Sequence, residues 1–206
     1  MSAPPDTVLD VPPEEAATIR AAVLAADLDA LGPGRSLAGR QDAADLTAFL
    51  ADPRVTDAIY DLPRPFTLEN VGRWIAESEA LRQEGRRLLI LTRDETGEIA
   101  GYSCVSVWPD RSASELAGAL RADRQSGGQG GSGALHTFGW IFSALKVRMM
   151  CLTAAMDNVR SAKLIDAAGF VRMGTRDAVR PDGTTRTSLY WEVTADQWRE
   201  RWGSRA

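Results

Sequence analysis

The chain has 206 residues, of which 44% are hydrophobic and 25% are charged, and 28 acidic residues against 24 basic ones give a net charge of −4. This length supports one substantial hydrophobic core, so we expect a single domain over residues 1–206. The composition excludes a disordered chain, the acidic balance argues against nucleic-acid binding, and no apolar run reaches the roughly 18 residues of a membrane-spanning helix. We therefore expect neither a nucleic-acid nor a membrane partner.

The N-terminus and the few cysteine and histidine residues argue against several further kinds of segment and site. The N-terminus lacks both a basic start and an apolar stretch, so we expect no targeting peptide and a cytoplasmic location. Cys104 and Cys151 stand alone in apolar runs, which is typical of buried thiols rather than of metal ligands or a disulfide. His136 is the only histidine, which argues against a His-rich metal site and a Ser-His-Asp triad, so we expect no metal.

The first part of the chain predicts helices. Residues 1–12 are proline-rich and are expected to be loose. Apolar residues recur every three or four positions between Val71 and Leu81, and Thr67 can cap this stretch. Alanine-rich composition or helical spacing predicts helices over residues 14–28, 42–50 and 67–85.

From residue 88 the sequence pattern changes from that of helices to that of β-strands. Residues 88–91 and 99–108 are β-type runs joined by a polar turn at 94–97, which predicts an antiparallel hairpin. Residues 115–122 could form a helix on propensity alone. Because this stretch is short, contains Gly118 and leads into a glycine-rich segment, we assign it as a strand.

The remaining elements alternate between helix and strand. Helical spacing predicts a helix over residues 134–145, and a second helix is expected over 159–168 with Asn158 as its cap and Gly169 at its end. Strands are expected over 147–153 and 187–193, with a hairpin turn at 180–183. This order predicts an α+β (mixed α/β) fold in which helices cover both faces of a mixed sheet.

Residues 125–133 form a glycine-dense segment directly before the helix that starts at Ala134. The first turn of a helix exposes unpaired N–H groups, and the helix dipole places about half an elementary charge at this end. Glycine lets an anion approach the backbone closely. The junction therefore predicts a phosphate site, and a pyrophosphate would fit it.

Three other interpretations of the glycines are weaker. Gly128, Gly130 and Gly133 match the dinucleotide fingerprint, but residues 121–126 stand where an apolar strand should lead directly into it, and a β-hairpin follows instead of repeated βαβ units. A GxxxxGK[ST] phosphate loop fails because no Lys-Ser or Lys-Thr pair follows. A flexible solvent loop leaves unexplained why the glycines adjoin a helix start.

The spacing of Gln125, Gly128 and Gly130 resembles the pyrophosphate loop of the GNAT superfamily of acetyl-CoA-dependent N-acetyltransferases, which has the form Q/R-x-x-G-x-G/A ahead of a helix. Residues 158–170 resemble the second signature of that family, N-x-x-S/A followed by Gly-Phe. Residues 62–67 and the following helix are similar to the ribosomal-protein N-acetyltransferase (Rim-type) branch. The likeness covers roughly residues 35–200.

This resemblance implies a GNAT-like fold whose mostly antiparallel central sheet splays at the cofactor site. It implies an acetyl-CoA-dependent N-acetyltransferase, with coenzyme A as co-substrate and a primary amine, either a protein N-terminus or a small molecule, as acceptor. We expect a monomer or a homodimer. Many relatives carry an acidic tyrosine where this chain has Ile165, so a non-catalytic acyl-CoA-binding protein of the same fold stays as an alternative.

The resemblance also implies roles for individual residues. We expect Glu115 to act as the base through water, the alternative being an ordinary surface glutamate, and Ser161 or water to protonate the departing thiolate. Asn158 would contact the cofactor, cap its helix, or do both. The backbone of Leu120 and Arg121 would pair with the pantetheine arm. The expected cofactor-binding residues are Leu120, Arg121, Gln125, Gly127, Gly128, Gln129, Gly130, Gly131, Ser132 and Asn158.

Overall fold

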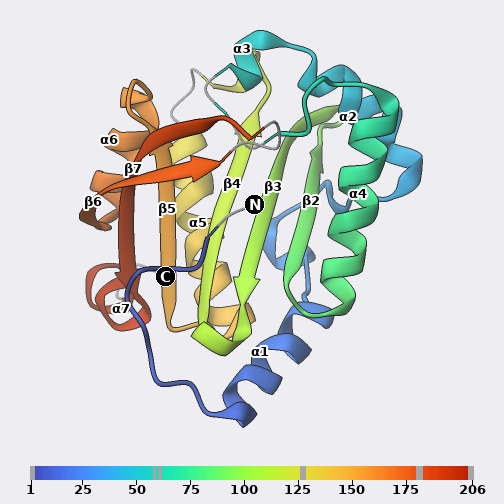
Figure 1. The fold of residues 1–206 in the computed structure, drawn as a ribbon. Helices are drawn as coiled ribbons and strands as arrows, with labels where there is room; N and C mark the ends of the chain where they lie inside the picture. Colours follow the sequence, from blue (N-terminus) through green and yellow to red (C-terminus); the bar gives the residue numbers. More distant parts are fainter. Residues whose placement is uncertain (1–2, 58, 60–61, 126–128, 180–182, 204–206) are drawn as a thin grey trace.

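A single mixed sheet forms the centre of the computed structural model, which describes residues 3–57, 59, 62–125, 129–179 and 183–203 (Figure 1). Within these residues, seven strands lie in the order β1-β2-β3-β4-β5-β7-β6. All neighbouring strands run antiparallel except β4 and β5, which are parallel. The strands are β1 (Arg35–Leu37), β2 (Arg87–Arg93), β3 (Ile99–Trp108), β4 (Ala113–Leu120), β5 (Met149–Ala155), β6 (Val171–Val179) and β7 (Thr185–Thr194).

Helices cover both faces of this sheet, as expected from the sequence. On one face α1, α5, α6 and α7 contribute to a core cluster with the strands, and on the other face α2, α3 and α4 form a second cluster. Figure 1 shows α5 behind β4 and β5, and α2 and α4 beside β2. The helices are α1 (Pro13–Leu24), α2 (Ala43–Leu50), α3 (Pro53–Thr56), α4 (Leu68–Gln83), α5 (Gln129–Leu145), α6 (Val159–Ala168) and α7 (Ala195–Trp202). None of the helices in the described part of the chain is long and apolar enough to span a bilayer.

The parallel pairing of β4 with β5 is short. Its register joins Ala113 to Met149 and ends where Glu115 pairs with Cys151. Beyond that point β4 continues to Leu120 and β5 to Ala155 without pairing to each other. The sheet therefore splits between its two central strands, which confirms the expected splay.

Several predicted elements are confirmed with small shifts. The β2–β3 hairpin is antiparallel, as expected, and residues 113–120 form a strand rather than a helix. Thr67 caps α4 through Asn70 N–H (3.2 Å), and Gly169 ends α6 at a φ of 92°. The first helix ends at Leu24 instead of residue 28. The elements α3, β1 and α7 were not predicted, and α3 and β1 are too short to show a period.

The expected start of α5 at Ala134 is wrong. The helix begins at Gln129, so Gly130, Gly131, Ser132 and Gly133 lie in its first turns rather than in a loop. Glycine disfavours a helix by about 1 kcal/mol per residue, which is why the sequence indicated a later start. Packing of the apolar face of α5 on the sheet outweighs this cost.

Hydrogen bonds attach part of the N-terminal segment to β7. Residues 3–10, here called the N-terminal strap, cross the face of the sheet opposite α5. Figure 1 shows this dark blue segment passing in front of β5. Asp6 N–H donates to the Tyr190 hydroxyl (3.1 Å), and Thr7 N–H donates to Glu192 Oε1 (3.1 Å). The Tyr190 hydroxyl donates in turn to Glu192. Backbone hydrogen bonds therefore fix a proline-rich segment that has no regular structure of its own.

We expect acid to release the N-terminal strap from β7. Burial raises the pKa of Glu192, but the hydrogen bonds from Thr7 and Tyr190 outweigh it and hold that pKa below its usual 4.5. A carboxyl whose pKa folding lowers contributes its full stabilisation above the unfolded pKa and loses it as the pH falls through the folded pKa. Protection factors of the Asp6 and Thr7 amides against hydrogen exchange should therefore drop as the pH falls below 4.5.

The matched control for this pH dependence is Glu192→Gln, which cannot titrate. In this variant the protection factors of the two amides should not change over the same pH range. An equal drop in both proteins would show that Glu192 does not cause the pH dependence.

Candidate active site

A cavity of about 1280 Å³ opens where β4 and β5 separate. Residues 115–120 of β4 and 152–155 of β5 form its two sides. The N-terminal turns of α5 and α6 complete the wall on the core side, and Val55 and Ile59 lie at the opposite side. The cavity therefore runs through the split from one face of the sheet to the other.

The split exposes backbone groups of β4. Arg121 N–H donates to Ala100 O (2.8 Å), so the amide of Arg121 points toward β3. Residues two apart in a strand share this direction, and their neighbours point the opposite way. Leu116, Gly118 and Leu120 therefore direct their N–H and C=O groups across the split toward β5. Of these groups, Leu120 O already accepts a hydrogen bond from Gln125 Nε2 (2.8 Å).

The N-terminus of α5 points its first amides at this region. The N–H groups of residues 129–131 have no partner within the helix, and the positive end of the helix dipole adds to their attraction for an anion. Gly131 and Gly133 line the cavity. Ser132 is exposed, and the predicted Gly127 and Gly128 lie outside the described residues. The described part of the glycine segment thus forms a helix start at the cavity, as an anion site requires.

The cap and the first turn of α6 also bring polar residues to the cavity. Asn158 Oδ1 accepts a hydrogen bond from Ser161 N–H (3.0 Å), which confirms Asn158 as the helix cap. Asn158, Ser161 and Ile165 follow one another at helical spacing along the side of α6 that lines the cavity. Any contact of Asn158 with a cofactor stays a prediction.

Glu115 lies at the point where the strands separate. The residue is only 7% exposed, which excludes an ordinary surface glutamate. Thr153 Oγ1 on β5 donates to Glu115 Oε1 (3.0 Å), and both residues line the cavity. Burial and then the charge of Glu115 raise the pKa of the Cys151 thiol. A buried carboxylate, held by a hydroxyl at the floor of a cavity, is suited to accept a proton from a bound molecule.

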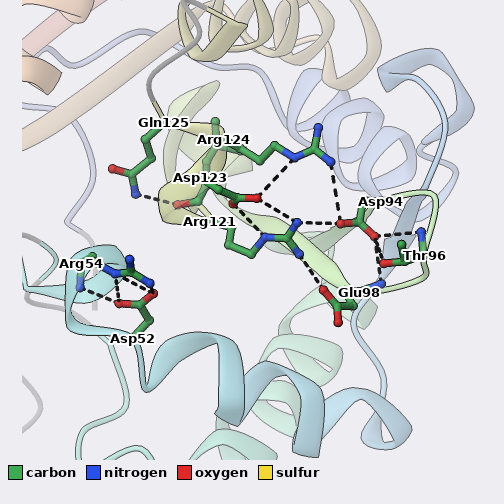
Figure 2. A network of polar contacts seen from close by, with 10 residues as sticks. Asp52, Arg54, Asp94, Thr96, Glu98, Arg121, Asp123, Arg124 and Gln125 are labelled. Carbon is green, nitrogen blue, oxygen red and sulfur yellow. Dashed lines mark hydrogen bonds and ion pairs between the residues drawn. The ribbon is translucent and has the colours of Figure 1, made fainter.

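The backbone of Arg121 was expected to pair with the pantetheine arm, and in the structure its N–H donates to Ala100 O and its carbonyl accepts from Arg124 N–H. Arg121 does not line the cavity, and its guanidinium binds Asp94 (2.8 Å), Asp123 (2.9 Å) and Glu98 (3.1 Å) (Figure 2). Hydrogen bonds from Thr96, and then from Arg121, lower the pKa of Asp94 to about 2. The same network raises the pKa of Arg121. Arg121 thus ties the turn after β4 to the β2–β3 hairpin.

Gln125 links the two sides of the split. Its Nε2 donates to Leu120 O at the end of β4, and its Oε1 accepts from Arg160 Nη1 of α6 (3.1 Å). Arg160 also donates to the backbone carbonyl of Gln125. Figure 2 shows the Gln125 side chain turned toward the end of β4. Both functional groups of this side chain are therefore used inside the protein.

Several site features were not found from the sequence. Thr153 and Arg160 carry interactions that depend on strand and helix neighbours far apart in the chain. The one available signal was a polar residue, Thr153, inside an apolar strand. The aromatic side chain of Tyr102 also lines the cavity. The described residues contain no cluster of three His, Cys, Asp or Glu side chains that could hold a metal.

Comparisons with known proteins agree with this geometry. Residues 35–171 match the family model of the acetyltransferase (GNAT) domain. The fold is similar to ribosomal-protein-S5-alanine acetyltransferase from Vibrio fischeri, with a TM-score of 0.66 at 20% identity over 80% of this chain and 93% of that one. No curated protein sequence matches the chain.

Two further similar structures contain coenzyme A groups. Mycobacterium smegmatis RimJ in complex with CoA-disulfide has a TM-score of 0.67 at 17% identity over 82% of this chain and 87% of that one. RimL, the ribosomal L7/L12 alpha-N-protein acetyltransferase in complex with coenzyme A, has a TM-score of 0.67 at 15% identity over 81% and 97%. At these identities the structures show a shared fold, and this confirms the expected α+β class.

The Asp94 network predicts how firmly the turn after β4 is held. In Asp94→Asn the charge that pairs with Arg121 is lost, so the turn at residues 121–125 should loosen. The hydrogen-exchange protection of the Arg124 and Gln125 amides, which bond to Arg121 O and Ala122 O, should fall several-fold.

Glu98→Gln is the matched control, because Glu98 binds the same guanidinium but is 74% exposed and screened by solvent. This variant should leave the two amides protected. If both substitutions have the same effect, Asp94 is not the anchor of the turn.

Proposed function

Because the chain belongs to the GNAT acetyltransferase family, we propose that it transfers the acetyl group of acetyl-CoA to a primary amine in a ternary complex. One observation carries the proposal: the split after the Glu115–Cys151 pair brings β4 backbone groups, the α5 N-terminus and a buried carboxylate into one cavity. Neither the helix start nor the carboxylate would define an acyl-transfer site alone.

The residues present fit coenzyme A. We assign the diphosphate to the first amides of α5, where glycines leave room for close approach. The pantetheine arm would pair with the outward backbone groups of Leu116, Gly118 and Leu120 like an added strand. Asn158 and Ser161 line the same path from α6. Gln125 and Arg121 act indirectly, because their side chains hold the ends of β4 and α6 in place.

The chemistry requires a nitrogen–carbon bond to form and a carbon–sulfur bond to break. Acetyl-CoA would supply the acetyl group as its thioester, and coenzyme A would leave as the thiol. Glu115 accepts the proton that the amine loses, through a water molecule, while Thr153 fixes the carboxylate. Ser161 donates a hydrogen bond to the sulfur, and the thiolate takes its proton from Ser161 or from water. Ile165 offers no acid at that place, so this step depends on those two sources.

The acceptor proposed here is a protein N-terminus. Two of the similar structures are named as acetyltransferases of ribosomal proteins, and this supports a protein substrate rather than a small amine. The test measures free thiol released from acetyl-CoA, once with short peptides that have free N-termini and once with small amines. The difference between them separates a protein acceptor from a small-molecule acceptor. The absence of thiol release with every amine, despite acetyl-CoA binding, would support the non-catalytic alternative. The cytoplasmic location stays a prediction.

Loss of the carboxylate charge at residue 115 should slow the chemical step. Glu115→Gln keeps the shape of the side chain and removes the base, so kcat should fall about 10²- to 10⁴-fold with little change in the KM for acetyl-CoA. Thiol release under saturating acetyl-CoA measures this effect.

The control for a buried carboxylate is Glu192→Gln. Glu192 is buried and pairs with Cys151 from the other side, but it does not line the cavity. The kcat of Glu192→Gln should stay near that of the unchanged protein. A normal kcat in Glu115→Gln would remove Glu115 from the mechanism.

A methyl group at residue 131 should separate folding from cofactor binding. A Cβ on Gly131 would lie 3.6 Å from Leu164 Cδ1, an ordinary contact, so Gly131→Ala should fold and stabilise α5. Helical Cβ atoms point toward the N-terminus, so the methyl group should intrude on the anion site. Calorimetry should show affinity for acetyl-CoA reduced by about tenfold, equivalent to ~1.4 kcal/mol.

Gly139→Ala in the same helix is the matched control. Its Cβ would lie 3.8 Å from Trp198 Nε1, and Gly139 does not line the cavity. This variant should gain about 0.5–1 kcal/mol of unfolding free energy and keep full affinity. Unchanged affinity in Gly131→Ala as well would place the phosphate elsewhere.

A further inference from the structure

Arg35, the first residue of β1, differs from the other arginines that line the cavity. Arg54 pairs with Asp52 (2.8 Å), Arg93 with Asp42 (2.7 Å), and Arg160 with Gln125. Arg124 lies within 4.0 Å of both Asp94 and Asp123. For the half-buried guanidinium of Arg35, the structure records no hydrogen bond or ion pair with any described residue. The cavity thus contains a cation that the described fold does not neutralise.

An unneutralised, half-buried charge is unfavourable for the fold. Burial lowers the pKa of Arg35, and no neighbouring carboxylate acts against this shift. Removing a charge from water without a partner costs free energy that hydrogen bonding to an anion can recover. The position of Arg35 on the cavity wall leaves it accessible to a ligand.

The strand pattern places Arg35 on the α5 side of the sheet. Arg35 and Leu37 share a face of β1, and Leu37 packs against the core cluster that contains α5. Leu116 packs against the same cluster, so its neighbour Glu115 points to the opposite face. Arg35 is therefore on the side where α5 begins, and not on the side of the proposed base.

Two connections bring Arg35 toward the N-terminal half of α5. The His136 ring Nε2 lies 2.9 Å from Ala30 O, so the segment before β1 is attached to the second turn of α5. Across the sheet, Arg35 pairs with Thr92, Thr92 with Gly101, and Gly101 with Leu120. Arg35, Thr92 and Leu120 all line the cavity. The guanidinium, the helix start and the end of β4 thus belong to one continuous wall.

We propose that Arg35 is a binding residue for a phosphate group of coenzyme A. This inference rests on the proposed function, and it adds a side-chain cation to a site otherwise built from backbone amides. Coenzyme A carries two kinds of phosphate, the diphosphate and the 3′-phosphate, and both offer oxygens that suit the planar guanidinium. An acceptor carboxylate is the competing ligand, but it would approach from the face of Glu115.

The test measures affinity by calorimetry for coenzyme A and for dephospho-CoA, which lacks the 3′-phosphate. Arg35→Gln should bind coenzyme A about tenfold more weakly than the unchanged protein, because it loses a charge-assisted contact. If dephospho-CoA binds both proteins equally, Arg35 holds the 3′-phosphate. If Arg35→Gln weakens the binding of dephospho-CoA by the same factor as that of coenzyme A, Arg35 holds the diphosphate. Equal affinity of both proteins for coenzyme A overturns the proposal.

Arg40→Gln is the matched control, because Arg40 is exposed in the same segment and does not line the cavity. It should bind both nucleotides normally, and Arg35→Lys should bind more tightly than Arg35→Gln. If Arg35→Gln fails to fold, the side-chain Nε–H resonance of Arg35 in the unchanged protein gives the answer. Coenzyme A should shift this resonance, and an unshifted resonance in the saturated protein overturns the proposal.

The outcomes separate this inference from the proposed function. If the unchanged protein binds neither coenzyme A nor dephospho-CoA, the acetyltransferase proposal fails. If it binds coenzyme A and Arg35→Gln binds equally well, only the role of Arg35 fails. A fall in affinity in Arg35→Gln with unchanged kcat at saturation shows binding without a part in the chemistry.

Discussion

The end of hydrogen bonding between β4 and β5 after the Glu115–Cys151 pair is the constraint on which the site depends. A parallel pair that continued to Ala155 would use the outward backbone groups of β4 and close the cavity. Because the strands separate, those groups become available to a ligand, and α5 and α6 start beside the opening. The same few residues thus determine both the interruption of the sheet and the shape of the cavity.

A split sheet needs other contacts to hold its two sides. Gln125 joins the end of β4 to Arg160 on α6, and Arg121 attaches the following turn to Asp94 in the β2–β3 hairpin. These side chains hold the opening without filling it. Their polar groups are used in the fold itself, so a change at Asp94 acts on the cavity through geometry.

The two faces of the split carry different chemistry. The helix starts of α5 and α6 and the Arg35 guanidinium lie on one side, where they attract anions. Glu115 points to the other side, toward the half of the sheet that the N-terminal strap crosses. An acyl donor with phosphates and an amine acceptor can therefore approach from opposite faces and meet at the split, which favours direct transfer in a ternary complex.

The sequence by itself determined the features that local spacing encodes. Helical periodicity and caps predicted α4 and α6, and β-type runs around a polar turn predicted the β2–β3 hairpin. The motif at residues 125–130 indicated the family that the domain match later showed. Only the tertiary structure decided the start of α5, where packing outweighed the low helix propensity of glycine. It also decided that the Arg121 guanidinium binds Asp94, Glu98 and Asp123, and that Arg35 lines the cavity with no recorded partner among the described residues. These outcomes depend on which residues from distant strands become neighbours, and pairwise contacts across a sheet leave no periodic signal in a single chain.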